Sequence, residues 1–286
     1  MVEPPLIPLA EWIDRLVDWL VVNYGDRLGE LNNWIVHKIG FFERFLSQSI
    51  AWPLMMVGFA ALAYHASRSL RLAAGVAAAL ALKWSQGRGT PTKQTLALLS
   101  VALVVTVALG LPLGVLMSQS DRVRALMTPV LDFMQTMPSF VYLIPVVMLF
   151  GLGTFSGVIA TTIYAAPPLV RLTDLGIRLV DKELIEAATA FGATRRQTLF
   201  GVQIPLALPN VMAGVNQSIM MALAMVVIAS MIGVRGLGQE VLYGLQRQEP
   251  GTGFVAGLSI VLLAIVLDRI TQAYGRRLAA HRHVPQ

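Results

Sequence analysis

Apolar residues gather in seven runs along this chain, separated by short polar segments. The runs cover about 50–66, 70–84, 95–117, 137–152, 157–170, 218–234 and 254–268. A helix needs about 20 apolar residues to cross the hydrocarbon core of a bilayer, and fewer when flanking side chains reach the interface. The pattern therefore predicts an all-α transmembrane protein, in which the run 95–117 is the clearest span.

The run 70–84 is the weakest of the seven candidate spans. It is short and rich in alanine, and Arg71 lies near its start. An interfacial or buried helix is therefore an alternative to a span there. Residues 49–94 are expected to form two additional spans ahead of the five later runs.

Lysine and arginine are divided unevenly between the two sides that seven spans define. If the long loop 171–217 is cytoplasmic, thirteen basic residues lie in short inside segments and five lie in short outside loops, namely Lys83, Arg88, Lys93, Arg235 and Arg247. Cytoplasmic loops carry the excess of Lys and Arg. The distribution predicts a multi-pass protein with its N-terminus outside and its C-terminus inside, although Lys83, Arg88 and Lys93 run against the rule.

Residues 1–48 form a different kind of segment, an amphipathic tail expected on the outer, periplasmic side. Apolar residues recur there at helical spacing in two stretches, which are Trp12, Ile13, Leu16, Val17 and Leu20, and then Trp34, Ile35, Ile39, Phe42 and Phe45. Seven acids against four bases make the tail a poor match for an anionic lipid surface. Helices packed along the outer edge of the bundle are the favoured interpretation, and a partner-binding role is the alternative.

Composition narrows the chemistry that this chain can perform. Hydrophobic residues make up 56% and charged residues 13% of the 286 residues, and there is no cysteine. The lack of cysteine excludes disulfides, thiolate metal sites and a cysteine nucleophile. Basic residues scattered through short loops fit a topology signal better than nucleic-acid binding. No Ser/His/Asp or paired-carboxylate arrangement indicates an enzyme, and His281 and His283 lack a third ligand, so no metal site is expected.

The long loop contains the segment with the clearest mechanical role, DKELIEAATAFGATRRQTLFGVQIPLALPN at 181–210. Residues 182–191 are good helix formers, and Gly192 lies where a helix end favours a left-handed residue. Thr194 is able to cap a second short helix, which Pro205 is expected to end. The pattern predicts a cytoplasmic helical hairpin that docks on a partner, with apolar contacts from Leu184, Ala187, Ala188, Phe191 and Leu199. A hairpin folded onto its own bundle is the alternative.

The spacing inside this hairpin resembles the EAA motif of ABC-importer permeases. Glu186-Ala187-Ala188 is followed after three residues by Gly192 and, nine residues later, by Val202-Gln203-Ile204-Pro205. Val202 and Ile204 depart conservatively from the I-x-L-P of the family. The resemblance implies a coupling contact with a separate ATPase subunit, made by Glu186, Ala187, Ala188, Gly192, Ile204 and Pro205. ATP and Mg²⁺ are expected on that subunit, and no cofactor is expected in this chain, which lacks a G-x-x-x-x-G-K-[ST] motif.

Further stretches resemble the permease subunits of the proline/glycine betaine/choline ABC importer family. They are Leu131–Pro138 with Phe140–Pro145, Gly214–Gln217 leading into Met225–Ile232, Gly236–Gln239, and Leu267–Arg269. The likeness covers roughly 95–275. It implies a type I ABC importer permease, with a five-helix core at 95–275 that contains the coupling loop, two extra N-terminal spans, and a cytoplasmic tail at 276–286.

The resemblance also implies a function, partners and a location. The chain is expected to be the membrane-spanning subunit of an ATP-driven importer in the bacterial inner membrane. Its solute would be of the glycine betaine, proline or choline class, imported by alternating access and used in osmoprotection. Expected partners are the ATPase, a soluble or lipid-anchored solute-binding protein, membrane lipid, and a second copy of the chain, since a closing ATPase dimer needs two docking points.

Two other functions are alternatives to this one. The same architecture could import an amino acid such as histidine. A stand-alone secondary transporter is less well supported, because the sequence shows neither inverted repeats nor charged residues near the membrane midplane.

Seven residues near the spans are candidates for the translocation path, namely Asp132, Gln135, Met137, Pro138, Asn216, Gln217 and Ser230. For Asp132, a path role and structural pairing are equally open. Asn216, Gln217 and Ser230 either line the path or join helices. Asp268 is expected to form a local ion pair with Arg269.

Two glycine patterns are interpreted as structural. Gly110 and Gly114 flank Pro112 in a small-xxx-small arrangement that predicts close helix packing or a hinge. Gly233-x-x-Gly236-x-Gly238 follows an apolar run without a βαβ context, so it predicts a turn outside the membrane and not a nucleotide site.

Overall fold

The computed structural model describes residues 9–45, 51–85, 87 and 89–280, and every regular element within these ranges is helical. The first half contains α1 (Leu9–Arg44), α2 (Trp52–Ser67), α3 (Leu70–Ser85), α4 (Gly89–Gln119), α5 (Asp121–Thr136), the 3₁₀ turn η2 (Ser139–Tyr142) and α6 (Leu143–Phe150). The second half contains α7 (Thr154–Arg178), α8 (Lys182–Ala190), α9 (Arg195–Thr198), the π-helical turn η3 (Leu199–Gln203), α10 (Ile204–Ser230), α11 (Leu237–Gln246) and α12 (Pro250–Ala280).

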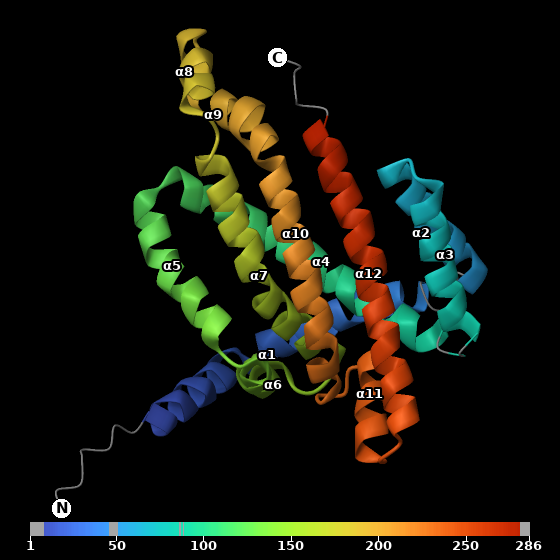
Figure 1. Ribbon diagram of the computed structural model, residues 1–286. Helices are drawn as coiled ribbons and strands as arrows, with labels where there is room; N and C mark the ends of the chain where they lie inside the picture. The colour runs from blue at the N-terminus through green and yellow to red at the C-terminus, as the bar shows by residue number, and fades with distance from the viewer. Residues whose placement is uncertain (1–8, 46–50, 86, 88, 281–286) are drawn as a thin grey trace, which may run out of the picture.

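Within the described residues, four helical stretches are long and apolar enough to cross a membrane. They are α4, α7, the continuous stretch Arg195–Ser230 that includes α10, and α12. A fifth candidate consists of two pieces, α5 and the segment Ser139–Phe150, which meet at a bend of 112° and form either one broken span or a re-entrant loop. These five make up the core that the sequence predicts. In Figure 1, α5, α7, α10 and α12 stand next to one another and α4 crosses behind them.

The bend after α5 lies at the start of the predicted span 137–152. Pro138 has no backbone N–H, and its ring forces the preceding residue out of the helical region. Met137 is accordingly extended, with φ −66° and ψ 135°, and ends α5. The apolar pattern did not reveal α5, because Arg122, Arg124 and other polar residues interrupt it.

The two additional N-terminal helices are α2 and α3, which form a hairpin packed against α12. Each has 16 residues. Such a helix is about 24 Å long, which is short of the roughly 30 Å hydrocarbon core. Arg277 near the end of α12 donates a hydrogen bond to the His65 carbonyl at 2.7 Å. The two helices lie at the positions in the chain that the first two apolar runs predict. Their crossing of the bilayer stays a prediction.

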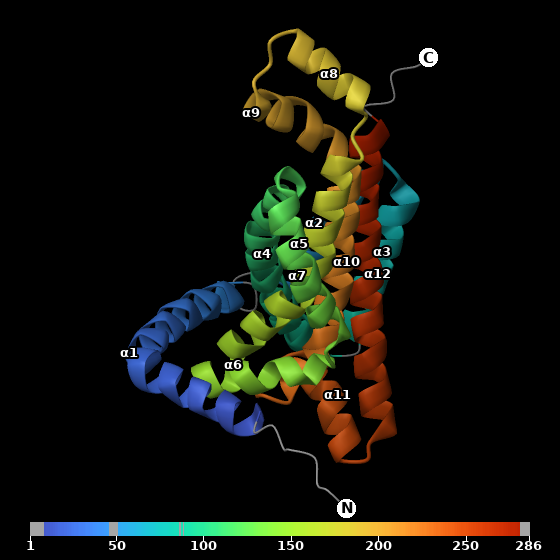
Figure 2. The ribbon, with the colours of Figure 1, turned by 90° about the vertical axis from the view of Figure 1, so that its left-hand side faces the viewer.

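α1 is a single helix of 36 residues, where the apolar stripes predict two segments. It curves along the side of the bundle (Figure 2) and contacts α4, α6 and α7. Val17 is buried, whereas Trp12, Leu16 and Trp19 are more than half exposed. These contacts fit the interpretation of a helix packed along the outer edge. The side chains of Trp34, Ile35, Ile39 and Phe42 lie outside the described residues.

The core is built around α7, which packs against both α4 and α10. A Cβ atom added at Gly114 of α4 would lie 2.6 Å from Cβ of Thr173 and 2.8 Å from the Val170 carbonyl oxygen. A Cβ atom at Gly110 would lie 3.0 Å from a methyl carbon of Leu169. Of the two roles considered for this glycine pair, the structure supports close helix packing.

The bundle has two unlike ends (Figures 1 and 2). The α8–α9 hairpin and the last turns of α12 lie at one end, and α6 and α11 lie at the other. Gly233 and Gly236 adopt positive φ in the turn before α11, so the predicted turn is confirmed. The ten-residue helix α11 after it was not predicted. His281 and His283 lie outside the described residues.

Candidate functional site

The first arm of the α8–α9 hairpin is built by local signals. Asp181 caps α8 by accepting a hydrogen bond from the Glu183 N–H at 3.0 Å. Gly192 reverses the chain with φ +82°, and its N–H donates to the Thr189 carbonyl at 2.9 Å. Glycine adopts this conformation readily because it has no Cβ atom. The left-handed conformation predicted for Gly192 is confirmed.

The second arm starts as predicted but does not end at Pro205. Thr194 caps α9 through a reciprocal capping box with Gln197. The chain then passes through the π turn η3 and continues into α10. In that turn the Ile204 N–H bonds to the Leu199 carbonyl, a wider spacing than in an α-helix. This local widening accommodates the proline ring and its missing N–H, so the prediction that Pro205 ends the helix is wrong.

The hairpin presents apolar side chains away from the bundle. Phe191 is 93% exposed and Leu184 is 47% exposed. Glu186 and Ala187 are exposed beside them, whereas Leu199 is buried against the bundle. Figure 2 shows α8 at the end of the molecule, beyond the membrane helices. An almost fully exposed phenylalanine on a projecting hairpin fits docking on a partner better than folding onto its own bundle.

The six candidate coupling residues divide between the projecting part and its base. Residues 186–188 and Gly192 lie on the projecting part and are exposed, apart from the half-buried Ala188. Ile204 and Pro205 lie half-buried at the base, where Ile204 packs against a cluster of Ile177, Leu199 and Ala207. The hairpin is therefore joined to the bundle through its second arm.

Asp132 of α5 pairs with Arg171 of α7. Of the two roles considered for Asp132, this contact favours structural pairing. Gln135 is exposed on the last turn of α5, and Met137 and Pro138 form the bend that follows. These four candidates lie together at the end of α5, apart from the others.

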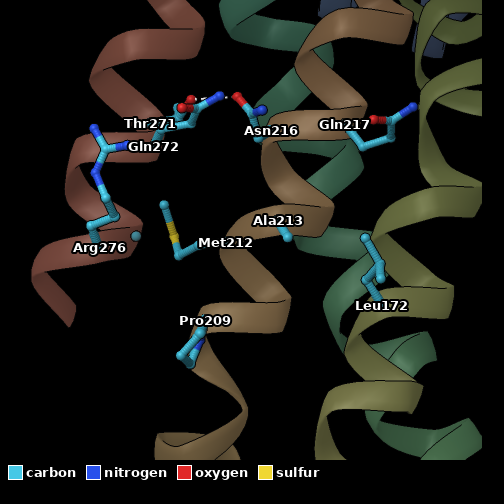
Figure 3. A pocket seen from close by; sticks show the side chains of 10 residues that line it. Leu172, Pro209, Met212, Ala213, Asn216, Gln217, Thr271, Gln272 and Arg276 are labelled. Carbon is cyan, nitrogen blue, oxygen red and sulfur yellow. Dashed lines mark hydrogen bonds between the residues drawn. The ribbon is translucent and has the colours of Figure 1, made fainter. Parts of the chain in front are cut away.

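Asn216 lies in a polar cluster between α10 and α12 (Figure 3). Its side-chain amide donates to the Asp268 carboxylate at 2.9 Å and accepts from the Thr271 hydroxyl at 2.6 Å. Gln272 donates to the same carboxylate at 2.7 Å. Among the described residues no ion pair joins Asp268 to Arg269, so that prediction is wrong. Adjacent residues on a helix point in different directions, which separates the two side chains.

A cavity of about 580 Å³ borders this cluster. Its lining includes Leu172 of α7, Met212 and Gln217 of α10, and Arg276 of α12 (Figure 3). The volume is in the range of small-molecule sites. Asp268 lies twelve residues before the end of α12 at Ala280, about 18 Å along the helix. Ionisable residues on a helix that is long enough to cross a membrane are candidates for function.

Ser230 does not join this cluster. It lies 14 residues after Asn216 on α10, about 21 Å along the helix, and its hydroxyl bonds to the Val227 carbonyl at 2.5 Å. Sequence reasoning missed Thr271, Gln272 and Arg276. They follow Asp268 by three, four and eight residues, so the spacing of one helix face could have revealed them.

Comparison with known proteins places these features among membrane transport components. A family model described as a binding-protein-dependent transport system inner membrane component matches residues 106–280. The chain is 46% identical over 278 residues to the glycine betaine/proline betaine transport system permease protein of Escherichia coli, covering 95% of this chain and 76% of that protein. It is 44% identical over 275 residues to the glycine betaine/carnitine transport permease protein of Listeria monocytogenes, covering 96% of this chain and 97% of that protein.

Two solved structures show the same fold at low sequence identity. A chain of an inward-facing methionine ABC transporter matches with a TM-score of 0.58 at 23% identity, covering 65% of this chain and 92% of that one. A chain of an amino acid ABC transporter with histidines matches with a TM-score of 0.53 at 22% identity, covering 70% of this chain and 94% of that one.

Proposed function

The chain belongs to the family of binding-protein-dependent transport system inner membrane components, and on this premise we propose that it imports a small quaternary-ammonium solute of the glycine betaine class. The names of its relatives include glycine betaine, proline betaine, carnitine and choline as solutes. All four carry a permanently cationic nitrogen without an N–H. This shared chemistry supports the solute class, and ATP-driven alternating access is the proposed mechanism.

The observation that carries the proposal is the projecting α8–α9 hairpin. Its exposed Phe191 and Leu184 offer an apolar surface to a cleft on a separate ATPase subunit. Glu186 beside them is exposed and is able to pair with a basic or hydroxyl group of that subunit. The chain lacks a phosphate-binding loop of its own. Closure of the ATPase pair would push on this hairpin and tilt the helices that it joins.

A homodimer in lipid completes the proposed assembly. One coupling hairpin per chain supports two copies of the chain on an ATPase pair. Val104, Phe254 and Val261 expose large apolar side chains on helices long enough to cross the membrane. Such surfaces favour contact with lipid or with the second copy. The hairpin end is proposed to face the cytoplasm, with the N-terminus outside and the C-terminus inside.

Labelling of single cysteines tests this orientation. Ala190 on α8 and Gln246 on α11 are exposed at opposite ends of the bundle. We expect Ala190→Cys to react with a membrane-impermeant maleimide only from the cytoplasmic side, and Gln246→Cys only from outside. The natural chain has no cysteine, so it supplies a control without background. Reaction of both variants from one face would contradict the topology.

The cavity in this chain is suited to a weak, transient solute site. A cation that cannot donate hydrogen bonds is usually held by aromatic faces, but none of the described residues that line the cavity is aromatic. Other rings pack on one another, with Tyr142 against Tyr164 and Phe150 against Phe155. We therefore place the tight solute site on the binding protein.

Reconstitution of the complex with its ATPase tests the function and the weak site together. Vesicles should accumulate glycine betaine only when ATP and the binding protein are both present. Without the binding protein, the complex should bind glycine betaine more weakly than about 1 µM, a free energy of about −8 kcal/mol. Import of histidine in place of betaine would assign the amino-acid class, and import without ATP would indicate a secondary transporter. Micromolar or tighter binding would refute the weak site.

A further inference from the structure

Two arginines from different helices donate hydrogen bonds to the end of α4, where the chain turns into α5; this junction is called the α4–α5 corner. The last carbonyls of a helix lack partners within the helix, and α4 ends at Gln119. Arg195 of α9 donates to the Gln119 carbonyl at 2.8 Å and to the Gln119 side-chain oxygen at 3.2 Å. Arg178 of α7 donates to the Met117 carbonyl at 2.8 Å. One of these arginines belongs to the coupling hairpin, and the other belongs to the core.

Arg178 also joins the first turn of α5 to α7. Its guanidinium contacts Asp121 at 2.7 Å and Asp174 at 2.9 Å. The other oxygen of Asp174 lies 3.2 Å from Arg124. The Asp174 side chain is only 5% exposed, and a buried carboxylate is stable when it is paired on both oxygens. The start of α5 is therefore attached by a connected set of charges.

The apolar attachment of α5 to the rest of the bundle is a small cluster. Leu131 is its one buried residue, and the half-buried Val123, Met127 and Met134 pack with it against Met117 and Val170. Leu126 and Phe133 are 68% and 64% exposed. Further along the helix, Asp132 pairs with Arg171. Segments with few buried apolar contacts open and move most readily. α5 is therefore suited to move relative to α7, with its polar contacts setting its position.

From these contacts we propose that Arg195 is a positioning residue that transmits movement of the coupling hairpin to α5 through the α4–α5 corner. A displacement of α9 would pull on the Gln119 carbonyl directly. Because Gln119 is the last residue of α4 and α5 begins at Asp121, two residues later, the pull would act at the joint between these two helices. This inference rests on the proposed function, since a separate ATPase must move the hairpin.

Arg196 provides a matched control for Arg195. It is the next residue of α9 and is exposed, and the hydrogen bonds and ion pairs found among the described residues do not include its side chain. Arg195→Gln and Arg196→Gln each remove one positive charge from the same surface of the hairpin. Only the first variant breaks the contact with α4. A comparison of the two therefore separates transmission from the general charge of the hairpin.

The test uses the complete complex of permease, ATPase and binding protein in vesicles. Three quantities are measured: the ATPase retained on purification, the glycine betaine imported per ATP hydrolysed, and the ATP-dependent signal of a fluorophore on Leu126→Cys of α5. In Arg195→Gln the ATPase should remain bound, import per ATP should fall about fivefold, as expected for the loss of the hydrogen bonds to Gln119, and the Leu126 signal should be lost. Arg196→Gln should behave as the unmodified complex does.

Two results would overturn the inference. One is an Arg195→Gln complex with normal import per ATP and a normal Leu126 signal. The other is an equal loss of bound ATPase in both arginine variants, which would make Arg195 a docking residue. A failure of the proposed function is distinguishable from both, because the unmodified complex would then not import glycine betaine.

Discussion

Gly114→Leu should lower the free energy of unfolding by about 3 kcal/mol, at the upper end of what overpacking costs. Already the first atom of the new side chain, Cβ, would lie 2.6 Å from Cβ of Thr173 and 2.8 Å from the Val170 carbonyl oxygen. The backbone oxygen belongs to α7, the most buried of the spanning helices, so it cannot move without separating α4 from the core. Thermal unfolding of the purified chain in detergent measures the loss.

Gly75→Leu is the control for this prediction. Gly75 lies within α3, and no atom lies within 4 Å of a Cβ built there. Leucine is also a better helix former than glycine. The stability of this variant should stay within about 0.5 kcal/mol of the natural chain or rise slightly. If the two substitutions lowered stability equally, the close contact between α4 and α7 would not be the cause.

Gly192→Val should reduce solute-stimulated ATP hydrolysis by about tenfold, because a left-handed backbone costs an L-residue roughly 1–2 kcal/mol. Gly192 has φ +82°, and no atom lies within 4 Å of a Cβ built there. Any loss therefore comes from the backbone conformation of the turn and not from a clash. The complex should still assemble, because Phe191 and Leu184 are unchanged. Hydrolysis with and without binding protein and solute measures the effect.

Gly192→Asn separates backbone conformation from the size of the side chain. Asparagine is close to valine in volume, yet it tolerates the left-handed region. This variant should retain most of the stimulated hydrolysis. Equal activity of the valine and asparagine variants would show that the positive φ of Gly192 does not matter for coupling.

Sequence reasoning succeeded where the determining forces act within a few residues. The left-handed turn at Gly192 and the cap at Thr194 depend on backbone sterics and on one local hydrogen bond. Two local inferences were nevertheless wrong. Pro205 does not end its helix, because a π turn precedes it. Asp268 bonds to Asn216 of another helix and not to its neighbour Arg269.

Contacts between helices were beyond the reach of the sequence. Asn216 and Asp268 are 52 residues apart in the chain, and Arg195 and Gln119 are 76 residues apart. Whether such side chains meet depends on how each helix is rotated and where it crosses its neighbours. That geometry is set by packing, for example by the glycine at 114 that lets α4 approach α7.

By itself, the sequence determined that this chain is an all-helical membrane protein with a helical hairpin between two of its spans. Long apolar runs have to be helical in lipid, because every backbone N–H and C=O must find a partner inside its own segment. Only the tertiary structure decided which polar side chains share a site. It joined Asp268 to Asn216 instead of Arg269, and it attached the hairpin to α4 through Arg195. Such pairings arise when packed helices bring distant residues within about 3 Å, a distance that no local pattern encodes.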